Sequence, residues 1–171
     1  MSPLARLAYR FRQFRLAFLG PWPRVPDKAL SPYLSPALIT IFRRMTLAEQ
    51  AHSLSVLERL QDSGQTDPDL LAAALLHDVG KSLSPLSIWE RVLIVLGKHF
   101  FPQAVEGWGD GEPRGLRRPF MVAIRHPAWG ADLVAAAGAS PRTVDLVRRH
   151  QDLSIADDLL LAALQQADDI E

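Results

Sequence analysis

Two ionisable residues, His77 and Asp78, stand directly after the segment Leu70 to Leu76, which is apolar at every position. A carboxylate buried alone is very costly, so it should be paired or bound to a cation. The ordinary alternative for such a dipeptide is a helix end satisfied by backbone and solvent. The chain has no cysteine, which excludes a disulfide scaffold, a thiolate nucleophile, an iron–sulfur cluster and a cysteine-ligated zinc site. Any metal must therefore be held by nitrogen and oxygen.

Three further histidines occupy positions that helical periodicity brings to an inward face or a helix end; they are His52, His126 and His150. Near the end of the chain, Asp168 follows Leu164 by four residues and should face the core, whereas Asp169 should point away. His99 shows no such alignment. Mixed imidazole and carboxylate ligands suit Mn, Fe, Co, Ni or Zn better than Mg or Ca. Each residue alone has an ordinary structural explanation, but together they indicate a metal site.

The segments that must position these residues look helical almost throughout, because no stretch alternates apolar and polar residues as a strand would. Thr46 and Glu49 form a capping box that begins one helix, and Asp67 caps the next. Gly80 is expected to end that second helix. The residue before a proline disfavours helical backbone, so a break is expected at Pro127.

The expected fold is all-α, a helical bundle with an additional amphipathic helix at the N-terminus. A loop rich in glycine and proline is expected over residues 101–118. The last helix is expected to start at Ser154 with Asp157. The expected helices cover residues 3–19, 37–44, 46–62, 68–77, 87–100, 119–126, 127–137, 141–151 and 155–170.

The N-terminal segment carries an apolar stripe at spacings of three and four, with arginines on its other faces; the stripe consists of Leu4, Leu7, Phe11, Phe14 and Phe18. A proline-rich connection follows, so we divide the chain into residues 1–45 and a metal-binding domain over residues 46–171. The favoured interpretation is a helix that packs on its own domain or forms a dimer contact. The alternative is a weak peripheral contact with a membrane or a partner.

Composition limits the function further. The chain has 171 residues, and its 19 basic and 19 acidic side chains give a formal net charge of zero. Binding of duplex nucleic acid is therefore not expected. The apolar runs are far shorter than the roughly 20 residues that cross a bilayer, and no clean signal peptide is present. These features favour a cytoplasmic location and leave the oligomeric state open.

The order of these residues resembles the HD superfamily of metal-dependent phosphohydrolases. The resemblance covers roughly residues 46–169 and rests on the local contexts EQAHSLSVLERL, AALLHDVGK, RHPAWGADLV and QADD. It implies that one divalent transition metal is held by four residues, namely His52, His77, Asp78 and Asp168. It also implies that His126 and His150 hold a second ion, with Asp78 as the bridging ligand.

The resemblance further implies hydrolysis of a small phosphorylated substrate, one candidate being a nucleotide, by a hydroxide activated at a dinuclear centre. Lys81 would contact the substrate phosphate; the ordinary alternative is a lysine that interacts with a helix C-terminus. Two alternatives remain open, a mixed-valent di-iron oxygenase and a regulatory module without catalysis. The branch that hydrolyses cyclic dinucleotides carries a Gly-Tyr-Pro loop, and no such loop follows His150 here.

Overall fold

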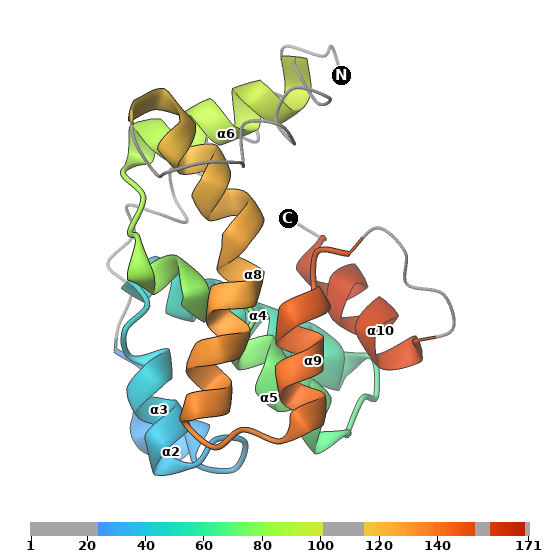
Figure 1. Ribbon diagram of the computed structural model, residues 1–171. Helices are drawn as coiled ribbons and strands as arrows, with labels where there is room; N and C mark the ends of the chain where they lie inside the picture. Colours follow the sequence, from blue (N-terminus) through green and yellow to red (C-terminus); the bar gives the residue numbers. More distant parts are fainter. Residues whose placement is uncertain (1–23, 101–114, 153–157, 170–171) are drawn as a thin grey trace.

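The computed structural model describes residues 24–100, 115–152 and 158–169, and these are helical with no strand (Figure 1). The all-α prediction is therefore confirmed. The predicted helix over residues 3–19 and most of the predicted loop over 101–118 lie outside the described residues. The elements are α2 (Asp27–Leu30), α3 (Pro36–Phe42), α4 (Leu47–Asp62), α5 (Pro68–Leu76), the 3-10 helix η1 (Val79–Leu83), α6 (Ile88–Phe100), the 3-10 helix η2 (Gly115–Arg117), α8 (Arg118–Ala136), α9 (Pro141–Arg149) and α10 (Leu159–Asp168).

Side-chain caps begin most of these helices. The capping box at α4 is present as predicted, with Thr46 and Glu49 each bonded to the other's backbone amide. The Asp67 carboxylate accepts from two amides of the first turn of α5. The predicted start of the last helix is wrong, because α10 begins at Leu159 and its cap is Asp158. The Asp158 carboxylate accepts from the amide of Leu161 at 3.1 Å.

Helix α5 forms the centre of the domain and is buried from Leu70 to Leu76. It packs against α4, α9 and α10. The helix ends at Leu76 rather than at Gly80, and the chain continues into η1. The short α2, which was not predicted, and α3 bury Leu30 and Phe42 in the same core. The described part of residues 1–45 thus shares one hydrophobic core with the rest of the chain.

Helix α8 is continuous from Arg118 to Ala136, so the predicted break at Pro127 is wrong. A proline inside a helix removes one backbone hydrogen bond and crowds the carbonyl four residues before it. Here Pro127 is buried and α8 is packed against η1 and α9. Packing therefore overrides the local preference that predicted two helices.

Gly80 lies where η1 and α8 come closest. A Cβ atom at residue 80 would stand 2.0 Å from the carbonyl oxygen of His126 and 2.7 Å from the amide nitrogen of Gly130. The glycine is therefore required for close approach of two backbones and not for ending a helix. This contact joins the segment after Asp78 to the middle of α8.

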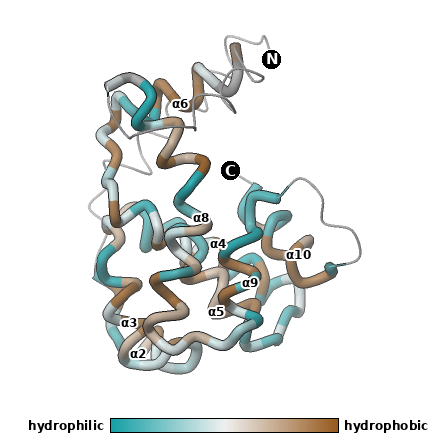
Figure 2. The backbone as a smooth tube through the Cα atoms, viewed as in Figure 1, coloured by the Kyte–Doolittle hydropathy of each residue, from teal (hydrophilic) through white to brown (hydrophobic). Residues whose placement is uncertain are grey.

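Helix α6 lies at the far end of α8 from α2 and α3 (Figure 1). Apolar residues run along it (Figure 2), and several are exposed, including Trp89 and Phe100. No helix among the described residues is long and apolar enough to cross a membrane.

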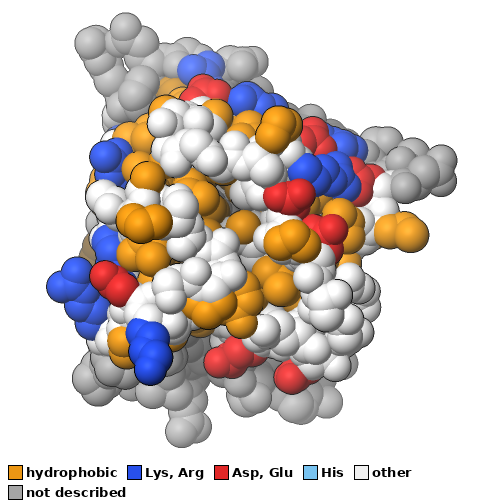
Figure 3. Space-filling view, turned by 90° about the horizontal axis from the view of Figure 1, so that it is seen from below, with side chains coloured by type: hydrophobic (Ala, Val, Ile, Leu, Met, Phe, Trp, Pro, Cys, Tyr) orange, Lys and Arg blue, Asp and Glu red, His pale blue; other side chains and the backbone are white. Residues whose placement is uncertain are grey.

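Charged side chains of both signs are interspersed on the face seen from below (Figure 3). One cluster of ion pairs joins α9 to the start of α10. Arg142 and Arg149 both contact Asp158, and both also contact Asp145. The hydrogen bonds from Arg142 are the largest influence that lowers the pKa of Asp158, to about 2. This cluster holds the first turn of α10 against α9.

Replacing Gly80 with alanine should strongly destabilise the protein. The added methyl group would overlap the backbone of α8, and we expect a loss of about 3 kcal/mol in the free energy of unfolding. Gly64 is the matched control, because an added Cβ there meets open space although its φ is +83°. Gly64→Ala should cost about 1 kcal/mol from backbone strain. Urea unfolding measures both, and equal losses would contradict the close approach.

Candidate metal centre

The structure brings all six predicted ligands together in the interior of the helical domain. His52 lies on α4 and His126 in the middle of α8, while Asp168 is the last residue of α10. His77 and His150 each follow the last residue of a helix, α5 and α9 respectively. Their donor atoms form two groups in which all atoms lie within 4.8 Å of one another. The first ligand group is His52, His77 and Asp168, and the second ligand group is Asp78, His126 and His150.

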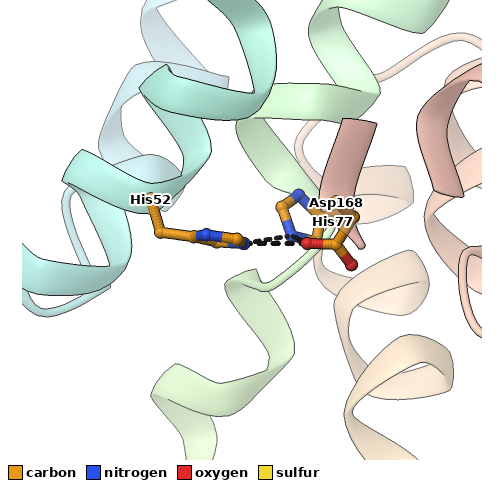
Figure 4. A group of neighbouring side chains, drawn as sticks. All are labelled: His52, His77 and Asp168. Atoms are coloured by element: carbon orange, nitrogen blue, oxygen red, sulfur yellow. Dashed lines mark hydrogen bonds and ion pairs between the residues drawn. The ribbon is translucent and has the colours of Figure 1, made fainter. Parts of the chain in front are cut away.

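In the first ligand group, two imidazoles and a carboxylate point at one place (Figure 4). The Nε2 atom of His52 lies 2.9 Å from Oδ1 of Asp168 and 3.3 Å from Nε2 of His77. The Nε2 atom of His77 lies 3.5 Å from the same carboxylate oxygen. His52 and Asp168 are 116 residues apart in sequence, so the packing of α10 against α4 creates this group.

In the second ligand group, the Nε2 atoms of His126 and His150 face each other at 3.2 Å. Oδ1 of Asp78 lies 3.3 Å from Nε2 of His126 and 4.0 Å from Nε2 of His150. The other oxygen of Asp78 lies 3.7 Å from Nε2 of His77, which belongs to the first ligand group. Asp78 therefore stands between the two groups with one oxygen toward each, as a bridging carboxylate requires.

Backbone carbonyls fix the orientation of the histidines at the helix ends. Nδ1 of His77 lies 2.9 Å from the carbonyl oxygen of Ala74, and Nδ1 of His150 lies 2.8 Å from that of Val147. A carbonyl only accepts, so each Nδ1 must carry the hydrogen. The last carbonyls of a helix run out of amide donors, which makes them available to these rings. In the neutral rings, Nε2 then presents a lone pair to the centre.

Pro127 supplies a corresponding acceptor in the middle of α8. Because proline has no amide hydrogen, it cannot donate to the carbonyl of Ala123 four residues earlier. Nδ1 of His126 lies 3.1 Å from that carbonyl and 3.1 Å from the carbonyl of Val122. The proline that was predicted to break the helix thus leaves an acceptor that orients His126.

These bonds create a requirement for a cation. With Nδ1 protonated on both His126 and His150, their Nε2 atoms bring two lone pairs within 3.2 Å and no proton lies between them. Only a proton or a metal ion makes such a contact favourable. The C-terminal ends of α5, α9 and α10 also meet here, and helix C-termini carry partial negative charge that favours cations. The residues present therefore fit a pair of transition-metal ions.

The carboxylates of the centre are held ionised. Burial alone raises the pKa of Asp78, but the charges of Lys81 and His77 outweigh burial and lower this pKa well below its usual value. Burial likewise raises the pKa of Asp168, and the neighbouring His77 and His52 lower it to a net value far below normal. Both aspartates are thus available as anionic ligands at neutral pH.

The histidines of the two groups differ in their affinity for protons. Burial and the neighbouring rings of His77 and His126 lower the pKa of His150 to about 3. Burial also lowers the pKa of His126. Burial acts in the same direction on His77, but the charges of Asp78 and Asp168 outweigh it, and its pKa is raised from 6.5. The imidazole rings of the second ligand group therefore stay neutral to a lower pH than the ring of His77 does.

Lys81 lies beside the centre, with Nζ 2.6 Å from Oδ2 of Asp78. Its side chain is about one quarter exposed, whereas the carboxylate of Asp78 is almost fully buried. The lysine therefore links the buried bridging residue to solvent. Its predicted contact with a substrate phosphate stays a prediction.

Arg59 is a residue of this centre that the sequence reasoning missed. It lies on α4, seven residues after His52 and on the same helical face, and its Nη1 donates to the carbonyl oxygen of Ala167 at 2.7 Å. The last turn of α10 has no basic residue of its own. Arg59 therefore provides a donor for a carbonyl in the last turn of α10, which carries Asp168. Its charge also offsets the partial negative charge of that helix end. The seven-residue spacing was the signal that could have revealed it.

Arg59→Ala is expected to weaken metal binding by the first ligand group about tenfold, because the turn that carries Asp168 loses its anchor. Calorimetric titration of the metal-free protein with Co²⁺ measures both groups. Arg148→Ala is the matched control, since it removes an arginine that pairs with the exposed Asp132 of α8, and it should leave both affinities unchanged. Equal effects of the two substitutions would contradict this role of Arg59.

Lowering the pH is expected to empty the two ligand groups in order. An imidazole must be unprotonated to bind a metal, and the pKa is raised from 6.5 at His77 but lowered at His126 and His150. The first ligand group should therefore lose its ion at a higher pH than the second ligand group. Cobalt absorption recorded during an acid titration follows both steps. Loss of both ions in one step would contradict this order.

Comparison with known proteins places this geometry in a family. No curated protein and no solved structure matches the chain. The family model of the HD domain matches residues 50–171, a range that contains every member of both ligand groups. With its helical fold and the paired His/Asp groups, the chain belongs to the HD domain family.

Proposed function

We propose that this protein is a metal-dependent phosphohydrolase that cleaves a phosphate ester at a dinuclear centre. The observation that carries this proposal is the pair of ligand groups facing each other across Asp78. Members of the HD domain family are typically metal-dependent phosphohydrolases. When bound, two such ions supply Lewis-acid chemistry that activates water and stabilises phosphoryl oxygens.

Individual residues of the chain would have separate roles in that chemistry. Asp78 would fix the separation of the two ions, because its oxygens face different groups. The rings of His126 and His150 would hold their ion away from bulk water, since both are buried. The ammonium group of Lys81 would offset the charge of the substrate phosphate, after exchanging its present contact with Asp78 for the phosphate oxygens.

Exposure indicates the side from which a substrate would arrive. His52, Asp168 and Lys81 are partly exposed, with side-chain exposures of 18%, 25% and 25%. The side chains of His77, His126 and His150 are only 1% exposed. A small phosphorylated molecule would therefore approach past the first ligand group and Lys81. A small phosphate ester such as a nucleotide fits this proposal better than a duplex nucleic acid, because the chain has no net positive charge.

The same donor set also suits a di-iron oxygenase, and the two proposals differ in what they consume. An oxygenase would use dioxygen and require iron in mixed valence, whereas a hydrolase would turn over without oxygen with Mn²⁺, Co²⁺ or Ni²⁺. Turnover that requires both iron and dioxygen would replace the hydrolase proposal. A purified protein that binds no metal would favour a regulatory module instead.

The proposed activity is tested with metal-free protein reloaded with Mn²⁺, Co²⁺, Ni²⁺ or Zn²⁺ and a panel of phosphate esters, with released phosphate as the measurement. Asp78→Asn should lower kcat/KM at least a hundredfold, because the amide cannot bridge two cations as an anion does. Asp169→Asn is the matched control, since Asp169 is the exposed neighbour of Asp168, and it should retain full activity. Phosphate release by the metal-free protein would contradict the proposal.

A further inference from the structure

Helix α10 contacts both ligand groups, although it provides a ligand to only one of them. Asp168 belongs to the first ligand group. Gln165 lies one turn earlier on the same helix and bonds to the end of the neighbouring α9, which carries His150 of the second ligand group (Figure 1). Helix α10 therefore connects a ligand of one ion to the backbone that positions a ligand of the other.

The side-chain amide of Gln165 donates to two backbone carbonyls at the end of α9. The bond from its Nε2 atom to the carbonyl oxygen of Asp152 is 2.9 Å long, and the longer bond to that of Arg149 is 3.5 Å. The carbonyl of Arg149 also accepts from the backbone amide of Asp152 at 2.8 Å. The last carbonyls of a helix lack amide donors within that helix. Gln165 therefore holds the turn of residues 149–152 on both sides of His150.

The position of this turn decides the geometry of the second ligand group. The Nε2 atom of His150 lies 3.2 Å from Nε2 of His126 and 4.0 Å from Oδ1 of Asp78. The Nδ1 atom of the same ring is bonded to the carbonyl of Val147, so the ring is fixed to its own backbone. A shift of residues 149–152 would therefore move Nε2 away from the other two ligands.

The first ligand group holds the same turn of α10 from the other side. Oδ1 of Asp168 lies 2.9 Å from Nε2 of His52 and 3.5 Å from Nε2 of His77. An ion bound among these three atoms would attach the last turn of α10 to α4 and to the end of α5. Because Gln165 belongs to that turn, its amide would be held in place as well.

We propose that Gln165 is a positioning residue that couples the two ligand groups, so that an ion in the first group orders the turn of His150 and raises the affinity of the second group. The inference rests on the dinuclear centre of the proposed function. Binding that orders a segment lowers the entropic cost of a second binding event that needs the same segment ordered. By linkage, an ion in the second group raises the affinity of the first by the same factor.

Two other contacts join the groups without Gln165. Asp78 has one oxygen toward each group, and the ring of His150 packs edge-on against that of His77, with ring centroids 5.2 Å apart. Both contacts act through side chains, whereas Gln165 acts on the backbone of the turn. The backbone amide of Asp152, which donates to a carbonyl that Gln165 contacts, therefore reports on the proposed route.

Hydrogen exchange at the Asp152 amide tests the coupling in a protein that loads only the first ligand group. His126→Gln removes a ligand of the second group, and calorimetry with Zn²⁺ verifies that a single ion binds. We expect Zn²⁺ to slow the exchange of the Asp152 amide, measured by NMR, about fivefold. Adding Gln165→Met, which keeps the length of the side chain but removes the donor, should leave the exchange rate unchanged by Zn²⁺. Gln166→Met is the matched control, since Gln166 is the exposed neighbour, and it should keep the full effect.

A second measurement uses the complete ligand set and therefore does not depend on the folding of the His126→Gln protein. Metal-free protein is titrated with Co²⁺, and the two stepwise association constants are compared. Gln165→Met should lower the ratio of the second constant to the first about fivefold. Gln166→Met should leave this ratio unchanged.

Two results would overturn the coupling and leave the proposed hydrolase intact. One is an Asp152 amide whose exchange does not respond to Zn²⁺ or responds equally after Gln165→Met. The other is an unchanged ratio of association constants in the Gln165→Met protein. Failure of the unsubstituted protein to bind Co²⁺ would instead overturn both the coupling and the proposed dinuclear centre, so the two failures are distinguished.

Discussion

The structure depends on one constraint, that imidazole lone pairs pointing at each other inside a protein need a cation between them. Each buried histidine of the centre gives its Nδ1 hydrogen to a carbonyl of its own helix. The opposite nitrogen then has nothing to donate and can only accept. The rings are held in this orientation before any ion binds. Metal binding therefore costs less conformational entropy than it would if the ligands had to be ordered by the ion.

The helices place their ends where this constraint needs them. A helix that stops at Leu76 or at Arg149 leaves last-turn carbonyls for the histidine that follows. A proline inside α8 creates the same opportunity in the middle of a helix. Helix termination, which is a local property of the sequence, thus becomes the means by which ligand geometry is set. Arg59 and Lys81 supply the positive charges that keep these anionic ends stable next to each other.

Much of the fold follows from local rules that the sequence displays. The capping box at Thr46, the cap at Asp67 and the apolar segment of α5 are each contained within a single helix, so each was predicted. The alignment of Asp168 with Leu164 likewise indicated which aspartate faces inward. These features concern α4, α5 and α10, which position His52, His77 and Asp168. The order of the motifs along the chain indicated how these residues combine with the others.

The features that sequence reasoning missed depend on contacts between distant segments. Gly80 is needed because its backbone approaches that of His126, which is 46 residues away in sequence. No local sequence rule predicts that contact. Pro127 looked like a break because the packing that tolerates it is tertiary. Asp158 was missed as a cap because Ser154, with Asp157 three residues later, fits the same local capping pattern four residues earlier in the sequence. Arg59 acts on a carbonyl 108 residues later.

The sequence separations within the two ligand groups differ in a way that bears on how the centre comes into being. The second ligand group spans residues 78 to 150, whereas the first needs both ends of a 116-residue interval. The second ligand group can therefore form from residues 78 to 150 without a ligand from α10. The first group closes only when α10 docks on α4, because Asp168 is the last residue of α10.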